Sequence, residues 1–155
     1  MEQEKEILIP RHISRLAIDY SIPIILQSSL VSFHKEHFVL SGFQYFVYLT
    51  SLAHWSCIYK TGFFRNLDIC AVLSALFYAT FVSCKYVDPV LAKLWYQTFA
   101  VSATVFTIDE IILYLGLLHI KDEQKITALK YYIVIMHMIF CHYGFSCCCM
   151  YCLLH

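Results

Sequence analysis

The chain has 155 residues, of which 60% are hydrophobic, 17% aromatic and only 14% charged. This composition is far more apolar than that of a soluble domain and predicts an integral membrane protein. A formal net charge of zero argues against an electrostatic nucleic-acid binder. The expected partners are therefore the lipid bilayer, a second copy of the chain or other membrane proteins, and no nucleic acid.

The chain begins with a charged stretch, MEQEKEILIPRH, that has none of the features of a secretory signal. We predict a cytoplasmic N-terminal segment at residues 1–15 and a single transmembrane helical domain at 16–155. The stretch 16–33 is short and carries Asp19 and Pro23, so it either crosses the bilayer or lies in its interface. The sequence leaves both alternatives open.

Four later segments are long and apolar enough for a helix to cross a hydrocarbon core, which takes about 20 residues. They are residues 38–59, 67–84, 91–119 and 129–154. Barrel strands alternate in shorter segments, whereas these runs are continuously apolar. The predicted fold class is therefore all-α, a polytopic transmembrane helical bundle of four or five spans.

Basic residues fall unequally on the two sides of such a bundle. If 16–33 spans, one side holds Lys5, Arg11, Arg15, Lys60, Arg65, Lys121, Lys125 and Lys130, and the other holds Lys35, Lys85 and Lys93. The positive-inside rule then predicts a cytoplasmic N-terminus and a C-terminus outside or in a lumen. If 16–33 lies in the interface, the later loops keep the same sides.

Asp109 and Glu110 are the first candidates for catalysis or for a polar path, because they lie well inside an apolar run. A charged side chain at the bilayer centre costs about 2.5–3.5 kcal/mol on insertion scales, so such groups face protein or water. Neighbouring residues point about 100° apart, so at most one of the two faces a given site squarely. The alternative is that this run is interfacial, or is shifted so that the pair sits nearer the headgroups.

Two histidines lie inside the last segment, His137 and His142. Five residues correspond to a rotation of about 140° around an α-helix, so we expect the two rings to point in different directions. His137 and Cys141 do have the i, i+4 spacing that places two side chains on one face. The alternative reading of each histidine is a neutral ring bonded to a neighbouring helix.

We count a rise of about 1.5 Å per residue from the cytoplasmic end of each predicted helix. This count places four polar residues in the same half of the membrane: His54, Asp68, Asp109 and His137. This shared depth predicts one polar cluster, which would be a metal site, a proton path or a set of hydrogen bonds. Neutral imidazoles with carboxylates and a water suit Zn²⁺, so His54, Asp68, His137 and His142 are the candidate metal ligands.

The chain carries a short set of motifs: Thr50 or Ser51 with His54, then NLD ending at Asp68, and HMIFCH with His137 and His142. This set resembles the CREST superfamily of membrane hydrolases, which includes hemolysin III-like proteins, progestin and adipoQ receptors and alkaline ceramidases. The resemblance implies bound zinc and a lipid-amide substrate. The family has seven helices and an i, i+4 spacing of its last histidines, whereas this chain has room for five helices and an i, i+5 spacing.

The stretch SCCCMYC places four cysteines near the end of the last segment: Cys147, Cys148, Cys149 and Cys152. Lipidation is expected on the cytoplasmic side, and disulfides in an oxidising compartment outside, so these two interpretations conflict. Apolar packing is the third alternative, and we also expect it for Cys57, Cys70, Cys84 and Cys141.

Three functional hypotheses follow. The first is a small multi-pass membrane protein with a structural or interaction role and no assignable catalysis. The second is a zinc-dependent, lipid-directed hydrolase in which Asp109 or Glu110 accepts a proton. The third is a small transporter or channel that uses the same two carboxylates.

Overall fold

The computed structural model describes residues 9–56 and 62–155, and these residues are helical apart from short connections. The all-α fold class is confirmed, since the described residues contain no strand. Lys5, Cys57 and Lys60 lie outside the described residues, as do the last residues of the predicted segment 38–59 and most of the predicted segment 1–15. The side chain of Cys84 is likewise not described.

The described residues form five long helices, two of which contain a short π-helical stretch. The first runs through α1 (Arg11–Leu16), η1 (Ala17–Ser21) and α2 (Ile22–His34). The next three are α3 (Phe38–Ser56), α4 (Phe63–Tyr86) and α5 (Pro89–His119). The last runs through α6 (Glu123–His137), η2 (Met138–Gly144) and α7 (Phe145–Leu154).

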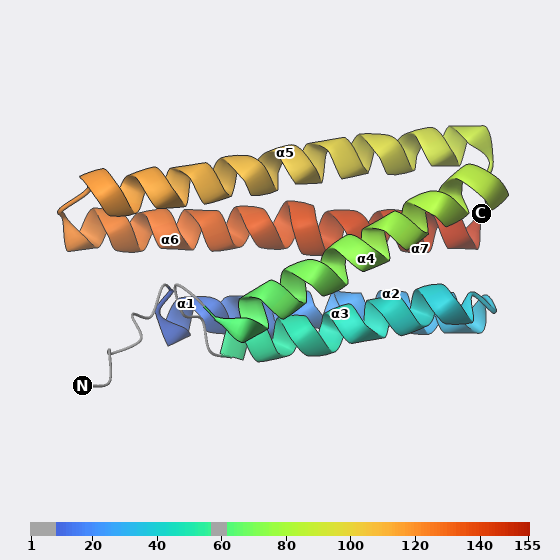
Figure 1. Ribbon diagram of the computed structural model, residues 1–155, viewed down its shortest axis with the longest axis horizontal. Coiled ribbons are helices and arrows are strands. Elements are labelled where there is room, and N and C mark those ends of the chain that lie inside the picture. Colours follow the sequence, from blue (N-terminus) through green and yellow to red (C-terminus); the bar gives the residue numbers. More distant parts are fainter. Residues whose placement is uncertain (1–8, 57–61) are drawn as a thin grey trace.

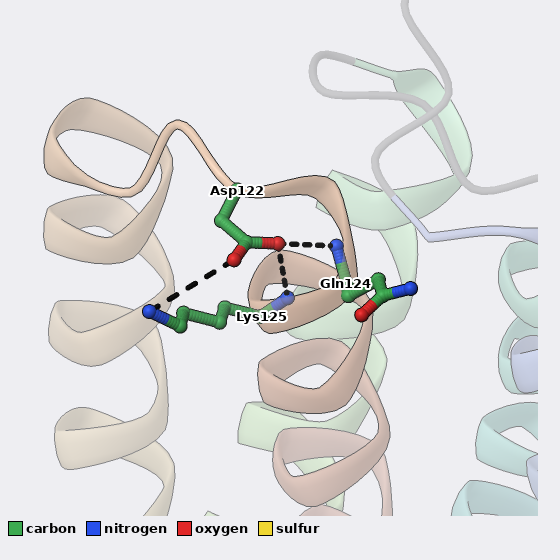
Figure 2. Close-up of polar contacts among 3 residues, drawn as sticks. All are labelled: Asp122, Gln124 and Lys125. Carbon is green, nitrogen blue, oxygen red and sulfur yellow. Dashed lines mark hydrogen bonds and ion pairs between the residues drawn. The ribbon is translucent and has the colours of Figure 1, made fainter.

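Side-chain caps explain where two of these helices begin. The Asp88 carboxylate accepts a hydrogen bond from the Val90 amide at 2.8 Å, ahead of Pro89 at the first position of α5. Asp122 accepts from the amides of Gln124 and Lys125 at 3.0 and 3.3 Å and also pairs with the Lys125 ammonium group at 3.8 Å (Figure 2). Both carboxylates satisfy amides that an α-helix leaves unbonded in its first turn.

The helices run up and down along one bundle axis (Figure 1). The starts of α1, α4 and α6 lie at one end of the bundle, and the C-terminus lies at the other end. Helices α2 and α3 pack antiparallel in one layer, and α5 packs antiparallel against the last helix, α6 to α7, in a second layer. Helix α4 crosses obliquely from the first layer toward the second.

Each π-helical stretch has a local cause or a local compensation. Pro23 follows η1 by two residues, and its ring removes the amide that would bond to the Asp19 carbonyl. In η2 the Phe140 carbonyl accepts a hydrogen bond at 2.7 Å from the Ser102 hydroxyl of α5. The Tyr143 hydroxyl also donates to the Tyr20 carbonyl, so side-chain contacts connect η1 directly to η2.

Large apolar side chains cover the outside of the bundle, and small polar ones lie within it. Phe63, Phe77 and Val90 are each more than 70% exposed, whereas Ser21, Ser32 and Ser51 are fully buried. Four helical stretches are long and apolar enough to cross a membrane: Arg11–His34, Phe63–Ser83, Pro89–Gly116 and Glu123–Leu154. This arrangement is the one a bilayer requires, with lipid as the outer solvent.

The membrane-crossing stretches differ from the predicted ones in one respect. Arg11–His34, which contains the segment left open by the sequence, is long and apolar enough to span. Helix α3, which covers most of the predicted span 38–59, is not among the four. Its buried polar side chains, among them Gln44, Thr50 and Ser51, explain its lower hydropathy.

Candidate functional site

His137 and His142 lie side by side, and the expectation that they point in different directions is wrong. Their ring centroids are 4.9 Å apart and their planes meet at 75°. The reason is η2, which begins directly after His137 and includes His142. A π-helical turn bonds residue i to i+5, so residues five apart share a face there, as residues four apart do in an α-helix.

The two π-helical stretches hold His142 in place from opposite sides. The imidazole Nδ1 of His142 lies 2.7 Å from the hydroxyl oxygen of Ser21, the last residue of η1. That hydroxyl also donates to the Ala17 carbonyl at 2.9 Å, so Nδ1 and the Ala17 oxygen are both within its reach. Both side chains are buried. His142 is therefore hydrogen-bonded to a neighbouring helix, whereas its neutral state stays a prediction.

Trp55 of α3 joins the histidines into one aromatic group. Its ring centroid lies 5.5 Å from those of His54 and His137 and 6.2 Å from that of His142. The indole is buried, and its nitrogen has no hydrogen-bond partner within the described part of the chain. An unpaired buried donor costs about 1–3 kcal/mol, so this indole N–H is available to a bound molecule.

Asp68 is held by two hydroxyl groups from the neighbouring helix α3. Its Oδ1 accepts hydrogen bonds from Thr50 Oγ1 at 2.9 Å and from Ser51 Oγ at 2.7 Å. Thr50 and Ser51 were named from the sequence only as matches to a family motif, and the structure joins both of them to Asp68. The second carboxylate oxygen, Oδ2, is left for other contacts.

A cavity of about 270 Å³ brings these polar groups together inside the bundle. Ser51, Asp68, His137 and His142 all line it, along with Cys141, the residue predicted to share a face with His137. Most of the remaining lining is apolar and comes from α4 and α5. We call Ser21, Ser51, Asp68, His137 and His142 the histidine cluster.

The other charged candidates lie apart from this cavity. Glu110 forms an ion pair at 2.6 Å with Arg65 of α4. Asp109 is buried, and its Oδ2 has no hydrogen-bond partner within residues 9–56 and 62–155. His54 contacts the histidine cluster through Trp55. None of these three side chains lines the cavity.

The four terminal cysteines have different surroundings. Cys147 is exposed, whereas Cys148 and Cys149 are buried in an apolar cluster with Leu40 and Trp95. The Cys149 sulfur also accepts a hydrogen bond from the Gln44 side-chain amide at 3.1 Å. Lipidation or disulfide formation at these positions stays a prediction.

The donor chemistry of the histidine cluster suits zinc, but the ligands are not all in place. Two imidazoles converge and a carboxylate lines the same cavity. In the described residues, however, no three His, Cys, Asp or Glu side chains are grouped closely enough to hold a metal ion. A third ligand would have to approach the histidine pair.

Sequence reasoning missed Ser21 and Trp55. Each lies among apolar neighbours without a motif of its own, and only the packing of η1 and α3 against η2 identifies it. Comparisons with protein-family models, with curated proteins and with solved structures found no match.

Proposed function

We propose that this chain is a small multi-pass membrane protein that binds a lipid-like molecule in the cavity of the histidine cluster. The observation that carries the proposal is one largely apolar cavity, with Asp68, His137 and His142 in its lining, inside a bundle of membrane-length helices. Binding sites for small molecules are mostly apolar, with a few convergent polar groups that fix orientation. A molecule that is apolar along its length and polar at one end matches this lining, and the bilayer supplies such molecules.

The polar residues favour a headgroup that donates hydrogen bonds. Thr50 and Ser51 satisfy one oxygen of Asp68, so the other oxygen accepts from a ligand hydroxyl, amide or amine. Ser21 engages Nδ1 of His142 and leaves the other ring nitrogen for a ligand. The Trp55 indole N–H is a further unpaired donor beside the two histidine rings, although Trp55 does not line the cavity.

Equilibrium binding of stearoyl glycerol to the full chain in detergent micelles tests this function. Asp68→Ala is expected to weaken binding about tenfold, because it removes a charge-assisted acceptor. Asp88→Ala is the matched control, since it removes a capping carboxylate that does not line the cavity. No saturable binding by the folded wild-type protein, or equal binding by both variants, would overturn the proposal.

A second candidate function is a zinc-dependent, lipid-directed hydrolase of the CREST type. The observation that favours it is η2, because this stretch gives the i, i+5 histidines the shared face that the family obtains with an i, i+4 spacing. His137, His142 and Asp68 would hold the metal, with His54 beside them. Bound zinc would supply an activated water for hydrolysis. Asp109 is preferred over Glu110 as the proton acceptor, because Glu110 is already paired with Arg65. Asp109 does not line the cavity, so this role would require an intervening group to carry the proton.

Metal analysis of detergent-purified protein tests this second function. We expect stoichiometric zinc in the wild type, its loss in His137→Ala, and its retention in His34→Ala, an exposed histidine on another helix. Folded wild-type protein without zinc would overturn the hydrolase and would favour the structural role. That role is supported by the hydroxyl groups that bond α2 to α3, such as Ser29 and Ser41.

The proposed orientation places the start of α1 in the cytoplasm and the C-terminus outside or in a lumen. The helix ends that carry the larger share of basic residues lie at one end of the bundle, which supports this orientation (Figure 1). Accessibility labelling of Lys5 and of the exposed Cys147 in sealed vesicles tests it. We expect labelling from opposite sides, and labelling from one side would contradict the orientation.

A further inference from the structure

A second polar group lines the same cavity, and neither proposed function uses it. The Gln44 side-chain amide of α3 donates to the Ser28 hydroxyl at 2.9 Å and to the Cys149 sulfur at 3.1 Å. Its carbonyl accepts from the Ser32 hydroxyl at 2.6 Å. We call Ser28, Ser32, Gln44 and Cys149 the amide cluster. Three of its members, Ser28, Gln44 and Cys149, line the cavity.

The amide cluster repeats part of the histidine cluster two helical turns away, on three of the four long helices that the histidine cluster occupies. The residue pairs are Ser21 with Ser28, Ser51 with Gln44, and His142 with Cys149. Each pair is separated by seven residues, which is two turns and about 10 Å along an α-helix. The cavity therefore presents two sets of polar groups about 10 Å apart along its length.

The surface between the two sets is mostly apolar, and Ser146 of α7 is a polar side chain within it. Ile25 lies between Ser21 and Ser28, and Val47 and Phe145 occupy the corresponding intermediate positions on the other two helices. All three intermediate side chains line the cavity. A bound chain would thus pass from polar groups over an apolar stretch to polar groups again.

We infer that the amide cluster is a second binding position, which selects an amphiphile with a hydrogen-bonding group part-way along its chain. This inference rests on the proposed binding of a lipid-like molecule. The Gln44 carbonyl has a second lone pair to accept with, and the Ser28 hydroxyl, which accepts from Gln44 and lies beside Cys149, has a hydrogen that a ligand oxygen would compete for. A mid-chain hydroxyl meets both needs, whereas a saturated chain leaves the buried amide cluster without a new partner.

A purely structural role is the competing explanation, because the amide cluster also joins α2, α3 and α7. The chain contains a matched control for it. Ser29 and Ser41 each donate at 2.9 Å to the other's backbone carbonyl, across the same α2–α3 interface, and neither lines the cavity. Removing either contact weakens the same helix pair without changing the proposed binding position.

The test is a binding series on the full-length protein in detergent micelles. The probes are stearoyl glycerol and isomers of hydroxystearoyl glycerol that carry the hydroxyl at successive carbons. We expect a mid-chain isomer to bind about tenfold more tightly than stearoyl glycerol, and isomers hydroxylated near either end to lose this preference. Gln44→Leu and the milder Ser28→Ala are expected to abolish the preference, and Ser29→Ala to keep it.

The outcomes separate the two proposals. If the wild type binds stearoyl glycerol but prefers no hydroxylated isomer, the second binding position is wrong and the proposed function stands. If Gln44→Leu and Ser28→Ala fold and keep the preference, the second position is also wrong. If no member of the series binds, the proposed function fails together with the inference.

Discussion

The histidine cluster and the amide cluster share three helices but depend on different helical geometry. In the histidine cluster, Ser21 ends η1 and His142 lies within η2. In the amide cluster, Ser28, Gln44 and Cys149 all lie on regular α-helix. One group thus depends on two departures from the α-helical repeat, whereas the other follows from that repeat alone.

The difference shows what a π-helical stretch contributes here. It accommodates one additional residue between His137 and Phe145, so that the rings of His137 and His142 meet and α7 still presents Cys149 to the interior. It also leaves carbonyl groups that accept from other helices, as Phe140 does from Ser102. Such stretches are frequent at functional sites, and both of them lie beside the histidine cluster.

The largest expected difference between the two clusters appears when a single residue is deleted beside each of them. Deleting Cys147 shifts the end of α7 by one position and turns it about 100°, so that the amide cluster loses Cys149. We expect a loss of roughly 3 kcal/mol in the free energy of unfolding, measured by SDS titration. Deleting Ile139 is expected to convert η2 to α-helix and to cost far less, because His137 and His142 then have an i, i+4 spacing. Equal losses would contradict the assigned role of η2.

A smaller effect is expected from His142→Ala, which removes one of the contacts between the two π-helical stretches. The loss of a buried hydrogen bond and of ring packing should cost about 2 kcal/mol. In a Trp95→Phe background Trp55 is the only remaining tryptophan, so its emission reports on this cluster. We expect an emission change in His142→Ala and none in His34→Ala. An unchanged Trp55 emission in His142→Ala would contradict the contact between the indole and the His142 ring.

In the amide cluster, Ser32→Ala is expected to cost about 1 kcal/mol, because it leaves the Gln44 carbonyl without its donor. Ser74→Ala is the control, since this exposed hydroxyl donates to the Cys70 carbonyl of its own helix. Thermal unfolding followed by circular dichroism compares the two variants. A larger loss in Ser74→Ala would show that the amide cluster contributes little to stability.

The smallest effect is expected at the Arg65–Glu110 ion pair, which lies outside both clusters. Both side chains are partly exposed, so Arg65→Gln should cost no more than about 1 kcal/mol. The same unfolding assay, repeated at high salt, checks this value, because salt screens an exposed pair. A loss as large as that of His142→Ala would mean that this pair holds α4 and α5 together.

Much of the architecture could be predicted from the sequence. Continuous apolar runs at 67–84, 91–119 and 129–154 correspond to α4, α5 and the last helix, because lipid requires helices to satisfy their own backbone groups. The stretch 16–33 could not be assigned, since Asp19 and Pro23 reduce its apolar character. In the structure Asp19 is exposed and pairs with Arg15 at 3.5 Å, and η1 lies just before Pro23.

The site was predicted less completely. His137, His142 and Asp68 were identified because imidazoles and carboxylates are costly in an apolar segment. Counting along an ideal α-helix then placed His137 and His142 on different faces, and this was wrong because the helix is not α-helical there. Gln44 was not identified, although its seven-residue spacing from Ser51 is visible in the sequence.

By itself the sequence determined the class of solvent, the helical content and the residue types that carry chemistry, because these depend on local hydropathy and on the cost of polar groups in lipid. Only the tertiary structure decided which of these residues meet. Whether His142 faces Ser21 and His137 depends on two π-helical stretches packed against each other. Ser21 and His142 lie 121 residues apart in the sequence, so no local pattern reveals the contact that holds this arrangement.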